Sequence, residues 1–446
     1  MIDSSTSPQH SLLSRAGCAL SGTLVAPGDK SISHRALILG ALASGTTKID
    51  GLLESDDVLA TAQAVAELGA TIARDDAGSW LVTGCNGQFV DTNPSLDLGN
   101  SGTGARLLMG AIAGAGGHAT IIGDDSLSSR PMARVLTPLT DMGLQSRSNQ
   151  GRLPVELRPS VLAGREITPK IASAQVKSAI LLAGLGARGD THVYEPRPTR
   201  DHTERMLPLF GGHLDIEPSG DGIRMSLPGE QALSAAILRV PGDPSSAAFA
   251  TIAALIVPGS QITIKGVMNN PGRSGLYDVL RRMGADMTVR PAGQEAGEDL
   301  IDIEIATSAM CGVAVDAKIA PSMIDEYPVL AVAAAFATGT TRFCGLSELR
   351  AKESDRLAAT HALLTRNGVR AAIEGDDLII EGCGPSGVTG GGVVQAHGDH
   401  RLAMSALVMG LASNQPVSTD SAAMIATSYP GFVRDMRALG ADMGST

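Results

Sequence analysis

The sequence predicts an α/β protein of two similar domains, each built from three copies of one β-α-β-α-β-β unit. Three observations lead to this fold class. A chain of 446 residues is too long for a single hydrophobic core, so two or three domains are expected. A polar loop followed by a helix of small residues occurs six times, at intervals of 69 to 82 residues. Each of these copies also contains a second helix that ends in Gly.

The six copies are anchored at equivalent positions. The small-residue helices begin near Gly28, Ser101, Ser173, Gly242, Ile324 and Gly398. The second helices end, in the same order, in ELGATI, DMGLQS, LFGGHL, RMGADM, RNGVRA and ALGADM. Six matches at similar spacing are not expected by chance, although small-residue helices are common in α/β proteins.

The first copy shows the order of elements within a unit. Its pattern predicts helices over residues 31–43 and 56–68, a strand over 46–50 and two strands around Thr71 and Trp80. Gly69 stands where the second helix needs a left-handed residue to end. The first helix is rich in Ala, Gly and Leu, so we expect it to be buried, with the amphipathic second helix and the sheet outside.

The first and fourth copies match most closely, in Pro27-Gly28-Asp29-Lys30-Ser31 and Pro241-Gly242-Asp243-Pro244-Ser245. This match predicts three units per domain and hinges near Gly28 and Gly242. The expected domains are residues 28–241 and residues 242–446 with 16–27. Residues 1–15 are polar and lack the features of a signal peptide, so we expect a disordered leader there.

The composition limits the partners. A formal net charge of −11 and 2% aromatic residues argue against a nucleic-acid-binding protein. The longest apolar stretches are far shorter than the roughly 20 residues that span a bilayer, so no membrane segment is expected. Five scattered cysteines without a CxxC pair favour free thiols in the reducing cytoplasm.

Cations are concentrated at the starts of the small-residue helices, where free N–H groups and the helix dipole favour anions. In an acidic chain this arrangement predicts a positive cleft for phosphate and carboxylate groups, although any single Arg is more often a surface or salt-bridge residue. The set comprises Lys30, Arg35, Arg106, Arg130, Arg134, Lys177, Arg197, Arg200, Arg205, Lys352, Arg356 and Arg401.

Two carboxylates in the second half are candidates for proton transfer. Asp325, followed by Glu326, opens an apolar helix, and Glu353 lies between Lys352 and Arg356. A carboxylate at a helix start is often only a cap, so the prediction depends on the neighbouring cations.

Three familiar motifs do not fit. Gly28-Asp29-Lys30-Ser31 lacks the Gly directly before Lys that a P-loop requires. Gly102-Thr103-Gly104 lacks the third glycine of a dinucleotide fingerprint. The two histidines of His397-Gly398-Asp399-His400 have no third ligand at a plausible spacing, so we expect no metal site.

Several motifs together resemble the 5-enolpyruvylshikimate-3-phosphate synthase family, from about Gly22 to Gly440. They are Gly28-Asp29-Lys30-Ser31-Ile32-Ser33-His34-Arg35, Leu98-Gly99-Asn100-Ser101-Gly102-Thr103, Ser129-Arg130-Pro131-Met132, Ser173-Ala174-Gln175-Val176-Lys177-Ser178, Arg200-Asp201-His202-Thr203-Glu204 and Lys352-Glu353-Ser354-Asp355-Arg356. The resemblance implies a two-domain inside-out α/β barrel with helix N-termini facing the cleft.

The resemblance also implies an activity. A member of this family transfers the enolpyruvyl group of phosphoenolpyruvate to the 5-hydroxyl of shikimate 3-phosphate and releases phosphate, in the shikimate pathway to chorismate and the aromatic amino acids. It implies no metal and no organic cofactor. We expect a cytoplasmic monomer with these two small-molecule substrates and glyphosate as an inhibitor, without nucleic-acid or membrane partners.

The matching motifs imply site residues. For shikimate 3-phosphate these are Lys30, Ser31, Arg35, Ser173, Ala174, Gln175, Arg200, Asp325 and Lys352. For phosphoenolpyruvate they are Lys30, Gly102, Arg130, Gln175, Arg356 and Arg401. Gly102 has a physical reason to lack a side chain, because the backbone must approach the ligand closely.

Four residues are implied as catalytic. Asp325 would take the proton of the attacking hydroxyl with the help of Lys352. Glu353 and Lys30 would serve the proton transfers at the methylene carbon and at the departing phosphate. Because these residues come from both halves of the chain, the site should be complete only when the domains close.

One departure suggests a subgroup. Thr427 stands where the better-known branch of the family has a Lys on the phosphoenolpyruvate side. With Arg130-Pro131-Met132 and Arg200-Asp201-His202-Thr203-Glu204, this resembles the second class of the family, whose glyphosate-insensitive members have Ala in place of Gly102. The Gly102 of this chain predicts that glyphosate still binds.

Three alternatives remain beside this prediction. The related transferase that acts on UDP-N-acetylglucosamine usually has a Cys in an Arg-Pro loop, and residues 124–134 contain none. A binding protein without turnover would not be expected to keep Asp325, Glu353, Lys30 and Lys352 together. An RNA-end-modifying enzyme of related fold is disfavoured by the acidity and the few aromatic residues.

Overall fold

The computed structural model describes residues 11–445 of the chain. These residues divide into two compact units. The N-terminal unit comprises residues 28–241 and 294–298, and the C-terminal unit comprises 11–27, 242–293 and 299–445. The segment 294–298 was expected in the other domain, and it belongs to the N-terminal unit because Glu298 is buried there against His202.

Six four-stranded sheets share one topology. In each, an edge strand pairs in parallel with its neighbour, and that neighbour pairs antiparallel with the next strand. One sheet therefore corresponds to each of the six predicted copies, and the β-α-β-α-β-β order is confirmed in outline.

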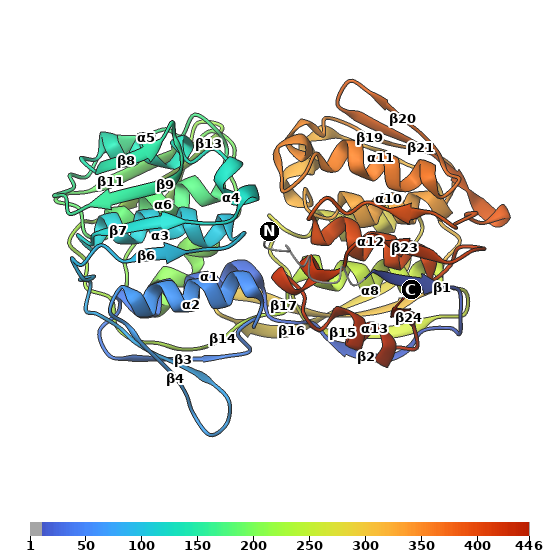
Figure 1. Ribbon diagram of the computed structural model, residues 1–446, viewed down its shortest axis with the longest axis horizontal. Coiled ribbons are helices and arrows are strands. Elements are labelled where there is room, and N and C mark those ends of the chain that lie inside the picture. The colour runs from blue at the N-terminus through green and yellow to red at the C-terminus, as the bar shows by residue number, and fades with distance from the viewer. Residues whose placement is uncertain (1–10, 446) are drawn as a thin grey trace, which may run out of the picture. The chain divides into compact units, whose positions relative to one another are not determined.

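The N-terminal unit contains the first three copies (Figure 1). The first comprises α1 (Lys30–Leu42), β3 (Thr46–Asp50), α2 (Asp56–Glu67), β4 (Thr71–Arg74), β5 (Trp80–Thr83) and β14 (Ile237–Arg239). The second comprises β6 (Ser95–Asp97), α3 (Gly102–Gly114), β7 (Ala119–Ile122), α4 (Asp125–Ser129), α5 (Ala133–Asp141), β8 (Gln145–Asn149) and β9 (Arg152–Arg158). The third comprises β10 (Glu166–Ile167), α6 (Ala174–Gly184), β11 (Thr191–Glu195), α7 (His202–Met206), the 3-10 turn η1 (Leu207–Phe210), β12 (Asp215–Ser219) and β13 (Gly222–Leu227).

The C-terminal unit contains the other three copies. The fourth comprises β2 (Ser21–Val25), α8 (Pro244–Ile256), β15 (Gln261–Met268), α9 (Gly275–Arg282), β16 (Asp286–Glu295) and β17 (Glu298–Ala306). The fifth comprises β18 (Ala314–Val315), η2 (Ala317–Ser322), α10 (Tyr327–Phe336), β19 (Thr338–Phe343), η3 (Ser347–Ala351), α11 (Arg356–Arg366), β20 (Arg370–Glu374), β21 (Asp377–Cys383) and η4 (Gly384–Ser386). The sixth comprises β22 (Val393–Val394), α12 (His400–Gly410), β23 (Val417–Thr419), η5 (Ala423–Thr427), α13 (Phe432–Ala438), β24 (Asp442–Ser445) and β1 (Leu12–Arg15).

The first helix of each copy lies in the core of its unit. The helices α1, α3 and α6 of one unit and α8, α10 and α12 of the other are buried on almost every side. Small residues permit this packing: α3 lies against α6 (Figure 1), and a Cβ added to Gly110 would meet the Ala179 carbonyl oxygen at 2.1 Å. Because these helices are fixed in the core, the free N–H groups at their starts are held in fixed positions as well.

The glycines after the six outer helices all take the left-handed conformation that the sequence predicted for Gly69. Their φ angles lie between 75° and 113°, a region that side chains rarely enter. They are Gly69, Gly143, Gly211, Gly284, Gly368 and Gly440.

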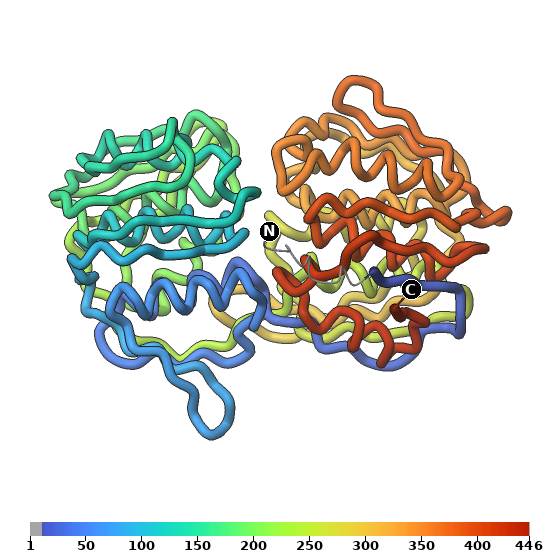
Figure 2. Tube along the Cα trace, viewed as in Figure 1, coloured from blue at the N-terminus to red at the C-terminus, as the bar shows by residue number. Residues whose placement is uncertain are grey.

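The prediction of a disordered leader up to residue 15 is wrong for its last residues, and its first ten lie outside the described residues. Leu12–Arg15 forms β1, which pairs antiparallel with both β23 and β24. Figure 2 shows this segment of the chain, in blue, beside the red C-terminal strands. Ser14 is fully buried and donates to the Leu407 carbonyl oxygen at 2.6 Å, so this polar residue is part of the core of the sheet.

The two matching Pro-Gly-Asp segments have reciprocal backbone bonds. The Asp29 amide donates to the Pro241 carbonyl oxygen, and the Asp243 amide donates to the Pro27 carbonyl oxygen, both at 2.7 Å. The chain thus passes between the units at two equivalent places, near the expected hinges, and again at both ends of 294–298. Among residues 11–445, no helix has the length and apolarity needed to cross a bilayer.

Candidate active site

The start of α1 supplies three predicted site residues. Asp29 caps the helix by accepting from the Ile32 amide at 2.8 Å, which places Lys30 and Ser31 in the first turn. Lys30 forms an ion pair with Asp57 of α2. Arg35 is buried one turn further on, where it donates to Thr203 at 2.7 Å and to Ser178 at 2.8 Å. Burial lowers the pKa of Arg35 to about 10, so the guanidinium stays charged at neutral pH.

The start of α3 brings Gly102 to two arginines. Ser101 caps the helix by accepting from the Gly104 amide at 3.1 Å. A Cβ at Gly102 would lie 3.0 Å from the Arg130 Nη1 atom and 3.4 Å from the Arg106 Nη1 atom. Arg130 in turn donates to the Asn100 Oδ1 atom at 2.5 Å. Backbone amides and two guanidinium groups therefore converge there, an arrangement suited to an anion.

The start of α6 completes this group. Ser173 is the N-cap residue, and Ala174 opens the helix. The side chain of Gln175 reaches α3: its oxygen accepts from Arg106 at 2.5 Å and its nitrogen donates to Thr103 at 2.9 Å. The charge of Arg200, which precedes α7, lowers the pKa of Arg35, and the two cations are therefore neighbours.

In the C-terminal unit, the site is built around Arg356. This side chain is 1% exposed and contacts three carboxylates: Asp325 at 3.0 Å, Glu353 at 2.5 Å and Asp399 at 2.7 Å. Burial opposes its charge, but Asp399, Glu353 and Asp325 raise the pKa of Arg356 above its usual value. The two carboxylates predicted for proton transfer thus share one fixed cation.

Two further predicted cations lie beside Asp325. The Lys352 Nζ atom is 3.4 Å from its carboxylate, and Arg401 donates to its backbone carbonyl oxygen at 3.2 Å. Glu326, the N-cap residue of α10, is buried and lies 3.8 Å from Arg401. All five residues predicted in this half are therefore brought together. In the other unit, Gln175 joins the starts of α6 and α3, and Arg35 joins α1 to Ser178 of α6.

Sequence reasoning missed the most buried partner of this site. Asp399 belongs to the His-Gly-Asp-His motif that was considered only for metal binding. In the structure it caps α12 through the Arg401 amide at 3.0 Å and holds Arg356 with both oxygens. Its position before a small-residue helix, equivalent to that of Asp29, was the available signal. Asn100 accepts a hydrogen bond from Arg130, and Asp57 forms an ion pair with Lys30. No comparable sequence pattern indicated these two contacts.

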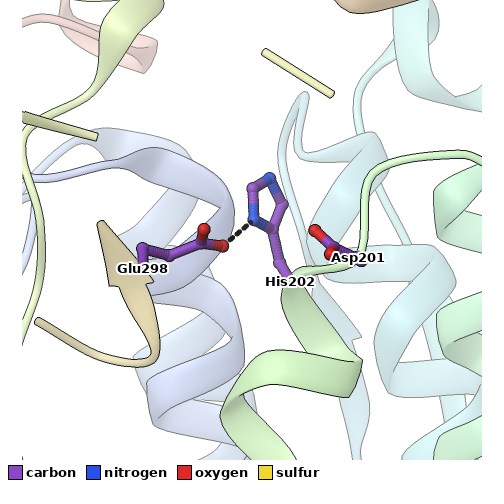
Figure 3. Close-up of side chains that lie close together, drawn as sticks. All are labelled: Asp201, His202 and Glu298. Atoms are coloured by element: carbon purple, nitrogen blue, oxygen red, sulfur yellow. Dashed lines mark hydrogen bonds and ion pairs between the residues drawn. The ribbon is translucent and has the colours of Figure 1, made fainter. Parts of the chain in front are cut away.

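One group within residues 11–445 has the side chains of a metal site, Asp201, His202 and Glu298 (Figure 3). His202 and Glu298 are buried and joined at 2.7 Å. Arg205, expected among the cleft cations, lies instead against this group, 2.7 Å from Asp201 and 3.5 Å from Glu298. A guanidinium therefore already supplies the positive charge that the two carboxylates require.

These features define the class of the protein as an α/β enzyme that acts on small anionic substrates: one unit has cation-rich helix starts, and the other has acidic residues suited to proton transfer. The family model described as EPSP synthase (3-phosphoshikimate 1-carboxyvinyltransferase) matches residues 14–436. The chain belongs to the EPSP synthase family.

The chain is similar to known proteins over nearly its full length. A 3-phosphoshikimate 1-carboxyvinyltransferase of Maricaulis maris is 55% identical over 426 residues, which are 96% of this chain and 95% of the relative. That of Afipia carboxidovorans is also 55% identical, over 97% of this chain and 98% of the relative. An EPSP synthase structure from Acinetobacter baumannii matches with a TM-score of 0.87 and 39% identity, covering 98% of this chain and all of the other.

The comparisons confirm the predicted fold, with its six small mixed sheets, and the predicted activity. The protein is a 3-phosphoshikimate 1-carboxyvinyltransferase of the shikimate pathway, which leads to the aromatic amino acids.

Proposed function

We propose that the two groups of side chains described above bind shikimate 3-phosphate and phosphoenolpyruvate and catalyse the transfer between them. The observation that supports this most strongly is the contact of Asp325 and Glu353 with the same buried Arg356. Carboxylates held at a fixed cation, with Lys352 close by, are suited to accept and return protons without moving.

In the proposed addition step, the 5-hydroxyl of shikimate 3-phosphate attacks C2 of phosphoenolpyruvate. Asp325, assisted by Lys352, takes the hydroxyl proton, and C3 gains a proton as its double bond is lost. The product of this step is a tetrahedral intermediate. In the elimination step, C3 loses a proton, the C2=C3 double bond forms again and phosphate leaves with the electron pair of its C–O bond. Glu353 and Lys30 serve the proton transfers at C3 and at the departing phosphate.

Shikimate 3-phosphate is proposed to bind mainly to the N-terminal unit. Arg35 and Arg200 are neighbouring cations, and the free amides at the starts of α1 and α6 favour the same phosphate charge. The proposed residues are Lys30, Ser31, Arg35, Ser173, Ala174, Gln175 and Arg200, together with Asp325 and Lys352.

Phosphoenolpyruvate is proposed to bind where the backbone of Gly102 lies close to the guanidinium groups of Arg130 and Arg106. Its phosphate and carboxylate are recognised by cations of both units, and bidentate guanidinium pairing suits both groups. The proposed residues are Lys30, Gly102, Arg130, Gln175, Arg356 and Arg401. Since the set is divided between the units, we propose that catalysis requires them to close on the substrates.

We also propose that the chain belongs to the second class of the family. The better-known branch of the family has a Lys at the position of Thr427. The Thr427 hydroxyl lies 3.4 Å from the Nδ1 atom of His400, the residue that precedes Arg401. We propose further that the enzyme is a cytoplasmic monomer, that glyphosate binds to it, and that the domains are those expected from the sequence except for residues 12–15 and 294–298.

The proposed role of Glu353 can be tested by solvent exchange. In deuterated water, the wild-type enzyme should place deuterium at C3 of phosphoenolpyruvate when shikimate 3-phosphate is present, because addition and elimination are reversible. Glu353→Gln should slow this incorporation by about 10²- to 10⁴-fold. Substrate binding, measured by calorimetry, should change little. Unaltered deuterium incorporation in the variant would exclude Glu353 from the proton transfer at C3.

A further inference from the structure

Three charged side chains are buried together in the third copy of the fold, and none of them has a proposed role in substrate binding. The Lys177 Nζ atom of α6 lies 2.8 Å from Glu195 and 2.7 Å from Glu204. The side chains of Lys177, Glu195 and Glu204 are 0%, 3% and 1% exposed. Apolar residues of similar volume often stabilise a core as well or better, so this set indicates a geometric requirement.

The set holds the segment that leads to Arg200. Glu195 ends β11, and its Oε1 atom accepts from the Thr199 hydroxyl at 2.6 Å. Its other oxygen accepts from the Thr199 amide at 3.3 Å, and Lys177 donates to the Thr199 carbonyl oxygen at 3.4 Å. The amide, carbonyl and hydroxyl groups of Thr199 are thus all hydrogen-bonded within this cluster. Arg200 is the next residue in the chain.

The far side of Arg200 is fixed as well. Thr203, in the first turn of α7, donates to Ser178 at 2.8 Å and accepts from Arg35 at 2.7 Å. Glu204, the residue after Thr203, forms an ion pair with Lys177, which precedes Ser178 in α6. The backbone of Arg200 is therefore held from both ends against the helix that begins with Ser173, Ala174 and Gln175.

Lys177 is the shared cation of the two glutamates in this cluster. Burial raises the pKa of Glu204, whereas the nearby Glu204 and Glu195 outweigh the effect of burial on Lys177 and raise its pKa. The charge of Glu204 also raises the pKa of Arg35, against the larger effect of burial. Lys177 therefore stays charged at neutral pH, and its three acceptors remain bound.

We infer that Lys177, Glu195 and Thr199 form a clamp that positions Arg200 for the phosphate of shikimate 3-phosphate. The inference rests on the proposed role of Arg200 in substrate binding. The three clamp residues are positioning residues, because they act through Arg200.

A double-mutant cycle with a matched control tests the clamp. Thr199→Val removes the hydroxyl but keeps the shape of the side chain, and Thr199→Ser keeps the hydroxyl. Calorimetry should show that Thr199→Val raises the Kd for shikimate 3-phosphate by on the order of 3- to 10-fold, whereas Thr199→Ser stays within about 2-fold of the wild type. The KM for phosphoenolpyruvate should hardly change in either variant.

The second arm of the cycle is Arg200→Ala, which should itself raise the Kd. Adding Thr199→Val to Arg200→Ala should cause no further increase, because the clamp acts only through Arg200. A full additional increase in the double variant would overturn the clamp while leaving the binding role of Arg200 intact. An unchanged Kd in Arg200→Ala would remove that role, and the inference with it.

Discussion

The Arg356 guanidinium forms a bidentate pair with the Asp399 carboxylate, with N–O distances of 2.7 and 3.3 Å, and both side chains are almost completely buried. Asp399 also caps α12 and accepts from Ser354 at 3.1 Å. The pair connects the starts of α11 and α12, so it fixes the cation that Asp325 and Glu353 contact.

Asp399→Asn should therefore impair both stability and catalysis. Removing one charge of a buried pair costs on the order of 3 kcal/mol, which calorimetry would record as a Tm several degrees lower. We also expect kcat/KM for phosphoenolpyruvate to fall by at least tenfold, because Arg356 loses its anchor. The matched control is Glu381→Gln, which removes the exposed partner of Arg370 and should change the free energy of unfolding by less than about 0.5 kcal/mol. Equal effects of the two variants would contradict this explanation.

Gly102→Ala should raise the inhibition constant of glyphosate. The new Cβ would lie 3.0 Å from Arg130, in the space proposed for the ligand. The measurement is inhibition of phosphate release as the glyphosate concentration is varied at fixed phosphoenolpyruvate. Gly17→Ala, at a position where a Cβ makes only ordinary contact at 3.4 Å, should leave inhibition unchanged. An inhibition constant that stays the same in Gly102→Ala would reject the steric account.

His34 should make stability depend on pH. It is fully buried, bonded to Thr61 at 2.8 Å, and burial together with the charges of Lys30 and Arg35 holds its pKa well below 6.5. The unfolded chain therefore binds this proton more readily, and stability is lost as pH falls below about 6.5, by at most about 1.4 kcal/mol per pH unit. The free energy of unfolding should fall less steeply with decreasing pH in His34→Gln, and should keep the wild-type slope in His213→Gln at an exposed site. An identical slope in His34→Gln would show that His34 does not contribute.

Ser14→Asp should destabilise the protein strongly, although the sequence predicted a disordered leader there. Ser14 is 0% exposed within the last sheet, so an Asp would bury an unpaired charge at a cost of several kcal/mol. Thermal unfolding should show a much lower Tm, while Ser21→Asp, at an exposed position of β2, should show almost none of this effect. A wild-type Tm in Ser14→Asp would mean that β1 does not contribute to the fold in solution.

The sequence predicted what depends on local patterns. The turn at Gly69 and the burial of the helix that begins at Lys30 follow from local sequence patterns, and the six-fold repeat follows from motifs that recur at intervals of 69 to 82 residues. The roles that the resemblance implies for the motif residues stay predictions.

What the sequence did not predict depends on contacts between distant segments. Ser14 bonds to a residue 393 positions away, and Arg356 to one 43 positions away. No local pattern shows that a polar Ser will be covered by another strand or that an Asp will pair with a distant Arg. The burial of Lys177 between two glutamates was hidden for the same reason, since a lysine at a helix start is usually exposed.

Phosphate release by the purified enzyme tests the central claim most directly. The enzyme is given phosphoenolpyruvate with shikimate 3-phosphate or with UDP-N-acetylglucosamine, and Asp325→Asn is measured in parallel. We predict release only with shikimate 3-phosphate, and a kcat lower by about 10²- to 10⁴-fold in the variant. Release only with the nucleotide sugar, or none with either acceptor, would contradict the assignment, and a wild-type kcat in Asp325→Asn would contradict the proposed base.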